Sequence, residues 1–380
     1  MSSTSDAKTR IVFLDYLRVI AIFMVMLVHA CEQYYFGADG GFYIASKWDA
    51  WWVVAIDSAC RAAVPLFVMA SAYLLFPIRG TNAAAQDGTG AWLRHRILRV
   101  GVPFAIWAAV YNWKFDGGWS NCLFNFPAAT GGHLWFVPML IGLYLLMPLL
   151  SPWAEKVEKK ELRGWILLWL FTTTFPYLRK LCGYWCGEPA FGAIPYLYGE
   201  CPWNGFGTFH YVSGFIGYML LGLYFRRFAV EISWSRTLGF ALPLLAIGWM
   251  IVVGGFYFRI SNYGAGFPVS APYAAAVDLE MSWEFCSLGI VMTVIGYFLL
   301  IRKLTSDGTF YRRVILPLSG ASYGVYLIHI LVLVSVIGWF KPSVTTPFAI
   351  IAAATTTFGL SSLISIIGRN LPKIGKWLFG

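Results

Sequence analysis

The chain has 380 residues, of which 59% are hydrophobic and 12% are charged, whereas soluble domains have roughly 45–50% and about 25%. With a mean hydropathy of +0.66, it has too few charges to cover a water-soluble surface, and an aromatic content of 18% excludes a disordered chain. Its apolar runs are long and continuous, which excludes an outer-membrane β-barrel, since the strands of such a barrel alternate apolar and polar residues. The net charge of +10 lies mostly in short loops and therefore favours a membrane protein over a nucleic-acid-binding protein.

A transmembrane helix needs about 20 mostly apolar residues. At that length the sequence predicts an all-α membrane bundle of about ten spanning helices. The first is expected to be a retained span, because no small-residue cleavage site follows it. Gly320 and Gly324 predict a kink or an interruption in the ninth. The expected spans are 11–33, 50–76, 97–113, 133–153, 164–178, 208–225, 237–256, 280–301, 314–339 and 347–367.

Lysine and arginine are distributed unequally between the two sides of these spans. The side that holds both termini carries 20 of them and the other side carries six. Because cytoplasmic loops are enriched in these residues, we expect both termini to lie in the cytoplasm. The six on the outer side are Lys47, Lys114, Arg179, Lys180, Arg259 and Lys341.

The outer segments 114–132, 179–207 and 257–279 are rich in glycine, proline and aromatic residues. This composition suits a carbohydrate-binding surface and equally suits an interfacial aromatic belt. Four cysteines fall in these segments, and in an oxidising compartment they predict one or two disulfides or else free thiols. Cys182 and Cys186 have a spacing that resembles that of metal ligands. We nevertheless expect no metal site, because no nearby histidine or second cysteine pair completes one. The cysteines are Cys122, Cys182, Cys186 and Cys201.

The first span carries two ionisable residues, Arg18 and His29. Eleven residues correspond to nearly three full helical turns, so both side chains project from one face, about 16 Å apart along the axis. With a cytoplasmic N-terminus, Arg18 lies in the inner half and His29 near the outer end. Ionisable groups within spans are costly to insert and are therefore functional candidates. The alternative is an arginine and a histidine that each reach the nearest interface.

The second span contains Asp57 and Arg61, which are neighbours on a helix face and predict either a structural ion pair or a functional role. Pro65 follows in mid-span, where a kink is expected. Two further spans carry polar motifs. The fourth opens with His133 and Trp135, and the ninth places Ser322, Tyr326 and His329 on one face.

The chain resembles acyltransferase family 3, whose members are integral membrane acyltransferases, many of which O-acetylate bacterial surface polysaccharides. Four stretches carry the resemblance, in the family's order. They are Asp15-x-x-Arg18 with His29, Arg61-x-x-Val64-Pro65-Leu66-Phe67, His133-Leu134-Trp135-Phe136, and Ser322-Tyr323-Gly324-x-Tyr326-x-x-His329. The chain departs from the family pattern at Ser71-Ala72-Tyr73, where members usually have Ser-Gly-Tyr.

The resemblance implies a single integral membrane domain over residues 1–380 in a bacterial inner membrane. It also implies an acyl-CoA donor, such as acetyl-CoA, on the cytoplasmic side and a sugar hydroxyl as acceptor, free or lipid-linked. We expect no permanently bound cofactor. The arginines that could hold the donor are Arg18, Arg79, Arg94, Arg96 and Arg99, although the positive-inside rule explains the last four without a ligand.

Acyl transfer to a hydroxyl needs a base and a group that stabilises the oxyanion. We expect His29 to be the base, with a covalent acyl-histidine as the competing mechanism. Arg18 completes the catalytic pair by steadying the donor. The candidates for binding the acceptor or polarising the carbonyl are Arg61, His133, Trp135, Tyr326 and His329.

The alternative function is a secondary transporter or flippase, with Arg18, His29, Asp57 and Arg61 lining its path. The halves of many transporters are internally symmetric, and the sequence shows no such repeat, which favours the enzyme. N-acylation or transfer of a succinyl group on the same scaffold stays open. The sequence also leaves open the identity of the sugar and the oligomeric state.

Overall fold

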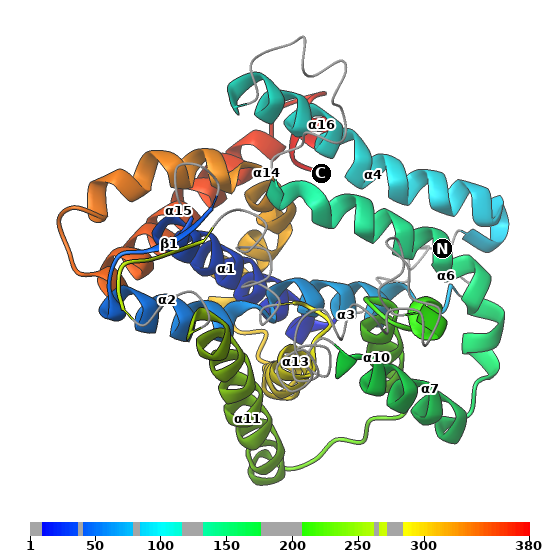
Figure 1. Ribbon diagram of the computed structural model, residues 1–380. Helices are drawn as coiled ribbons and strands as arrows, with labels where there is room; N and C mark the ends of the chain where they lie inside the picture. Colours follow the sequence, from blue (N-terminus) through cyan, green and yellow to red (C-terminus); the bar gives the residue numbers. More distant parts are fainter. Residues whose placement is uncertain are drawn as a thin grey trace.

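The computed structural model describes residues 10–36, 41–78, 84–115, 132–175, 207–261, 266–271 and 284–380. Over these residues the chain is almost entirely helical (Figure 1). Its α-helices are α1 Val12–Tyr35, α2 Lys47–Cys60, α3 Ala63–Leu75, α4 Ala84–Phe115, α6 Phe136–Lys156, α7 Lys159–Thr172, α10 Ile216–Arg227, α11 Trp234–Ile260, α13 Leu288–Ile301, α14 Leu316–Phe340, α15 Thr346–Arg369 and α16 Gly375–Phe379. The four cysteines of the expected outer segments and Arg79 lie outside the described residues.

Within the described residues, six helical segments are long and apolar enough to cross a membrane. They correspond to the first, second, fourth, seventh, ninth and tenth expected spans. The other four expected spans coincide with α4, α7, α10 and α13, which are shorter or more polar. A helical membrane protein is thus confirmed, while ten spans and cytoplasmic termini stay predictions. The six segments are Val12–Tyr35, Lys47–Leu75, His133–Lys156, Trp234–Phe258, Tyr311–Phe340 and Thr346–Arg369.

Helix α1 lies at the centre of the bundle, where it packs against α2, α3, α14 and α15 (Figure 1). Its side chains are apolar around most of the circumference, and Leu17, Ala21 and Ile22 are fully buried. A helix that is hydrophobic on all sides is expected to be surrounded by other helices. The central position of α1 brings His29 into contact with residues of other helices.

The second span is broken into α2 and α3 at Arg61 and Ala62. Pro65 explains the position of the break, because proline has no N–H to donate and its ring collides with the carbonyl four residues earlier. That carbonyl belongs to Arg61. The helix is thus interrupted near the expected position, with right-handed helical backbone angles at Arg61 and Ala62, while a bend there stays a prediction. The interruption leaves Asp57 and Arg61 at the carboxyl end of α2.

The expectation of a kink at Gly320 and Gly324 is wrong, because α14 is a continuous α-helix through both. The irregular turn comes earlier, in the π-helical segment η5, Tyr311–Ile315. The glycines instead allow close packing. A Cβ atom on Gly324 would lie 2.2 Å from Oγ of Ser365 and 2.9 Å from the ring of Phe379, so α15 and α16 approach the backbone of α14 directly.

The described residues also include one pair of antiparallel strands, β1 Phe42–Ile44 and β2 Val269–Ala271, with Tyr43 opposite Ser270. The expectation of a purely helical chain missed this pair, because three residues are too few to show a strand periodicity. Strand β1 follows the carboxyl end of α1, and so the pair lies near the end of the bundle that carries His29 (Figure 1).

Candidate functional site

Three histidines from distant parts of the sequence meet inside the bundle. His29 comes from α1, His133 from the 3-10 helix η1, Gly132–Trp135, and His329 from α14. The ring centroid of His329 lies 5.0 Å from those of His29 and His133, and the other two rings are 6.2 Å apart. His29 is the predicted base, and His133 and His329 are predicted to bind substrate. The structure brings all three together as one histidine cluster.

His29 has a carboxylate partner one helical turn away. Its Nδ1 lies 2.5 Å from Oε2 of Glu32. A carboxylate only accepts hydrogen bonds, so Nδ1 of His29 carries the proton and the lone pair of the neutral ring is on Nε2. Glu32 is not among the predicted site residues, although its i+3 spacing from His29 indicates this contact.

The imidazole of His329 is held in the same tautomer by a different partner. Its Nδ1 lies 2.6 Å from the carbonyl oxygen of Tyr326, in the preceding turn of α14. A carbonyl only accepts, so Nδ1 is the donor and Nε2 of the neutral ring has a free lone pair. His329 is completely buried, and its Nε2 has no hydrogen-bond partner among the described residues.

Tyr326 connects the ninth span to the fourth. Its hydroxyl donates a 2.7 Å hydrogen bond to the carbonyl oxygen of His133. The ring of His133 packs 4.6 Å from that of Tyr111, whose own hydroxyl donates to the carbonyl oxygen of Leu327 on α14. Tyr326 and Tyr111 thus hold η1 against α14. In the described part of the chain, Nε2 of His133 is also buried without a partner.

Asp57 and Arg61 form a buried ion pair. Nε of Arg61 donates to Asp57 over 2.5 Å, and Nη2 donates both to Asp57 and to the hydroxyl of Tyr35. Arg61 also interacts electrostatically with Glu32. Arg61 therefore acts on Glu32, the partner of His29. The predicted role of Arg61 in substrate binding stays a prediction.

Arg18 lies toward the amino end of α1, about 16 Å along the helix axis from His29. Its Nη1 donates to Asp15 over 3.3 Å. The carboxylate of Asp15 also accepts hydrogen bonds from Arg10 (2.6 and 2.9 Å), Tyr311 (2.7 Å) and Ser319 (2.6 Å). The hydrogen bond to Asp15 raises the pKa of Arg10 above its ordinary value. Asp15 thus anchors the amino end of α1, and Arg18 keeps a partly exposed side chain.

Two of the other expected donor-binding arginines share an electrostatic partner, Tyr144, with Arg18. Arg96 and Arg99 of α4 interact electrostatically with one another and with Tyr144, as Arg18 does. These three residues, Arg18, Arg96 and Arg99, form an arginine cluster. Arg94 is exposed. It precedes Arg96 by two residues, and therefore projects from the opposite side of α4. The structure therefore groups two of the three α4 arginines with Arg18.

Trp135 is 38% exposed, and its indole packs against Phe215 and Phe285, with ring centroids 5.9 and 5.2 Å away. This aromatic group lies next to His133 in the chain. Its proposed contact with an acceptor stays a prediction. Among the described residues, no three His, Cys, Asp or Glu side chains are arranged to hold a metal ion.

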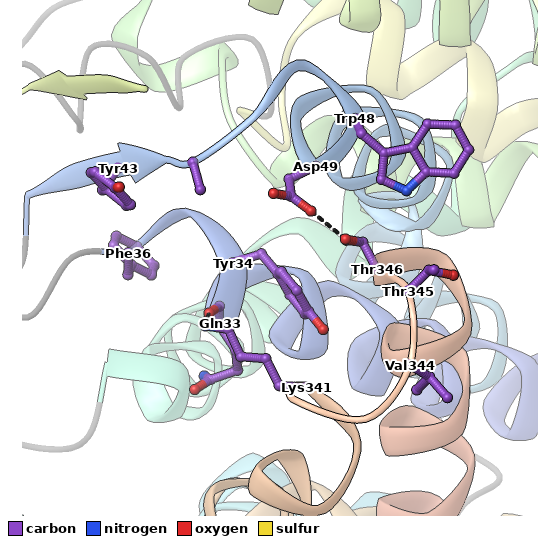
Figure 2. A pocket seen from close by; sticks show the side chains of 11 residues that line it. Gln33, Tyr34, Phe36, Tyr43, Trp48, Asp49, Lys341, Val344, Thr345 and Thr346 are labelled. Atoms are coloured by element: carbon purple, nitrogen blue, oxygen red, sulfur yellow. Dashed lines mark hydrogen bonds between the residues drawn. The ribbon is translucent and has the colours of Figure 1, made fainter. Parts of the chain in front are cut away.

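A surface pocket of about 460 Å³ lies at the carboxyl end of α1 (Figure 2). Gln33 and Tyr34, which follow Glu32 directly, form one wall, and Asp49 accepts a hydrogen bond from Thr346 across it. Lys341 donates a 2.6 Å hydrogen bond to the carbonyl oxygen of Gln33. Residue spacing does not predict this pocket, because its walls come from α1, β1, α2 and the α14–α15 turn.

Comparison with known families gives one match. The family described as an acyltransferase domain matches residues 11–366. Comparisons with curated proteins and with solved structures gave no significant match. The matched residues include the histidine cluster and the arginine cluster. They also include nearly all of the six segments that are long and apolar enough to cross a membrane. Because the match extends over nearly the whole chain, the protein belongs to acyltransferase family 3.

Proposed function

We propose that this protein is an O-acyltransferase of the bacterial cytoplasmic membrane. It transfers an acyl group, acetyl in the simplest case, from cytoplasmic acyl-CoA to a hydroxyl of a cell-envelope saccharide that is free or lipid-linked. Membership of the family supports acyl transfer. The observation that carries the proposal is the division of α1, with Arg18 near one end and the His29–Glu32 pair near the other.

The arginine cluster suits the donor. Acyl-CoA carries phosphates on its nucleotide head and a long, thin pantetheine arm that ends in the thioester. Guanidinium groups bind phosphate through paired, charge-assisted hydrogen bonds. In the described part of the chain, Nε of Arg96 is buried without a hydrogen-bond partner, so it retains a donor for such an anion. The roughly 16 Å between Arg18 and His29 along α1 is then bridged by the arm.

The His29–Glu32 pair suits general-base catalysis. As the acceptor oxygen attacks the thioester carbonyl carbon, its proton moves to Nε2 of His29, and Glu32 stabilises the imidazolium that forms. The tetrahedral intermediate collapses with cleavage of the C–S bond. The thiolate of CoA leaves and takes the proton from His29. An acyl-histidine intermediate is the alternative route, in which Nε2 itself attacks the thioester.

A binding and transfer assay with the purified protein in nanodiscs tests the proposal. We expect acetyl-CoA to bind and to be consumed only when a saccharide acceptor is present, with release of free CoA thiol. His29→Ala should bind acetyl-CoA normally and lose transfer, because the base acts only on the way to the transition state. Arg312 is exposed and lies between the eighth and ninth expected spans, on the side of the termini, which is expected to be cytoplasmic. It provides the control Arg312→Ala, which should retain both properties. Unimpaired transfer by His29→Ala contradicts the base assignment.

Failure to bind any acyl-CoA, together with saccharide flux through the protein in liposomes, would instead support the transporter alternative. The family match favours the enzyme over that alternative.

A further inference from the structure

The histidine cluster contains more hydrogen-bond acceptors than acyl transfer to a single hydroxyl requires. His29 supplies the base, yet His329 adds a second imidazole whose ring centroid is 5.0 Å away. The Nδ1 of each ring is fixed by an acceptor on its own helix, so both neutral rings have their lone pair on Nε2. Two such acceptors cannot hydrogen-bond to each other, and each needs a donor from elsewhere.

The two rings differ in the group that could stabilise a positive charge on the imidazole. Glu32 stands beside His29 and stabilises an imidazolium there. The Nδ1 partner of His329 is a backbone carbonyl, and its side chain is completely buried. Burying a charge without a countercharge is costly, whereas a neutral ring needs only a hydrogen bond. The base role therefore falls to His29, and His329 is suited to accept a hydrogen bond without taking the proton.

We propose that His329 binds a second hydroxyl of the acceptor, adjacent to the one that is acylated, so that the enzyme selects a vicinal diol. This inference rests on the proposed function. The two ring centroids are 5.0 Å apart, so an acceptor with two adjacent hydroxyls is of a size to reach both Nε2 atoms through hydrogen bonds of roughly 2.8 Å. The buried Nε2 of His329 is then satisfied only by an acceptor that has the second hydroxyl.

The test compares acceptors that differ by one hydroxyl. Octyl glycosides of glucose, galactose, mannose and rhamnose are offered with acetyl-CoA to the protein in nanodiscs, and the acylated position is mapped by NMR. Monodeoxy analogues that lack a neighbouring hydroxyl are then compared with the parent glycoside. Because a site built to hydrogen-bond a hydroxyl strongly rejects an analogue without it, we expect kcat/KM to fall at least about 100-fold.

Variants of His329 identify the residue responsible. His329→Phe keeps a ring of similar size and removes the acceptor nitrogen. It should lose activity on the diol and keep the residual activity on the deoxy acceptor, so that the preference falls to a few-fold. His329→Gln offers a side-chain carbonyl and should recover part of the preference. Ser335→Ala, at an exposed position on the same helix, is the control and should change neither rate.

Three results would overturn the inference. The first is a wild-type enzyme that acylates parent and deoxy glycosides equally. The second is a preference that persists in His329→Phe, as expected if Nε2 binds only a buried water. The third is an equal loss on both acceptors, which indicates a purely structural role. If the wild type acylates none of the glycosides, the proposed function fails, and that result is distinct from the other three. Should His329→Phe not fold, His329→Gln and the wild-type comparison still decide the matter.

Discussion

The Nδ1 atom of His29 lies 2.5 Å from a carboxylate oxygen of Glu32, three residues further along the same helix. This contact fixes the tautomer of the imidazole and leaves Nε2 as the proton acceptor. Both residues are largely buried, with side chains 16% and 19% exposed. An interaction in such an environment orients the ring and stabilises its charged form, as the aspartate does in a serine-protease triad.

Replacing Glu32 tests this contact. Glu32→Gln keeps the size of the side chain and removes its charge, so an imidazolium at His29 loses its stabilising partner. We expect kcat for acyl transfer to fall roughly 100- to 10,000-fold, with acetyl-CoA affinity unchanged. Steady-state kinetics and calorimetry provide the two measurements. Glu155→Gln makes the same change at an exposed site and should have no effect. A normal kcat in Glu32→Gln would show that His29 works without its carboxylate.

Arg18 is expected to act on donor binding. A hydrogen bond to a charged group contributes about 1.5–3 kcal/mol, so Arg18→Ala should raise the Kd for acetyl-CoA about 10- to 100-fold. Asp15 keeps its other three partners in this variant, so the fold should survive. Isothermal titration in detergent measures the change, and Arg18→Lys should retain part of the affinity. If Arg18→Ala binds the donor as tightly as the wild type does, the arginine cluster is not the donor site.

The buried pair of Asp57 and Arg61 makes a stability prediction. Arg61→Met leaves the carboxylate of Asp57 without its strongest partner, and breaking a buried ion pair costs about 3–5 kcal/mol. We therefore expect a clear loss of thermal stability in detergent. The double variant Asp57→Leu with Arg61→Met removes both charges and should recover most of that stability. A double variant that is stable but inactive would show that the pair also serves the reaction.

Close helix packing at Gly324 gives a matched comparison. A Cβ atom there would lie 2.2 Å from Oγ of Ser365, so Gly324→Ala forces α14 and α15 apart and should cost about 1–3 kcal/mol. A Cβ atom on Gly338, in the same helix, would meet none of the described residues within 4 Å. Gly338→Ala should therefore be neutral or raise the melting temperature slightly. Equal melting temperatures for the two variants would contradict the packing explanation.

Cysteine labelling tests the orientation of the chain. The native thiols are first replaced. Single cysteines are then introduced at Ser306, between the eighth and ninth expected spans and therefore expected to be cytoplasmic, and at Ser343, in the α14–α15 turn. A membrane-impermeant reagent applied to intact cells should label position 343 and leave position 306 unlabelled until the cells are opened. The reverse pattern would invert the topology inferred from the distribution of lysine and arginine.

The sequence alone determined those features that depend on composition and on local helical geometry. Its hydrophobic content and long apolar runs predicted a helical membrane protein, and the family match and the six long apolar helices agree. The eleven-residue spacing of Arg18 and His29 placed both on one face of α1, because helical periodicity is a local property. Pro65 predicted the break in the second span for the same reason, since it disrupts the turn directly before it.

Only the tertiary structure decided which of these residues meet. His29, His133 and His329 lie on three elements far apart in the sequence, and their contact depends on how α1, η1 and α14 pack. Gly320 and Gly324 predicted a kink, whereas α14 is continuous through both. A glycine within a helix can either weaken the helix or allow a neighbouring helix to approach closely, and only the packed structure shows that neighbour. The free lone pair of His329 likewise follows from a carbonyl at 2.6 Å and from complete burial. Both depend on the backbone path and on the surrounding helices, which residue spacing does not specify.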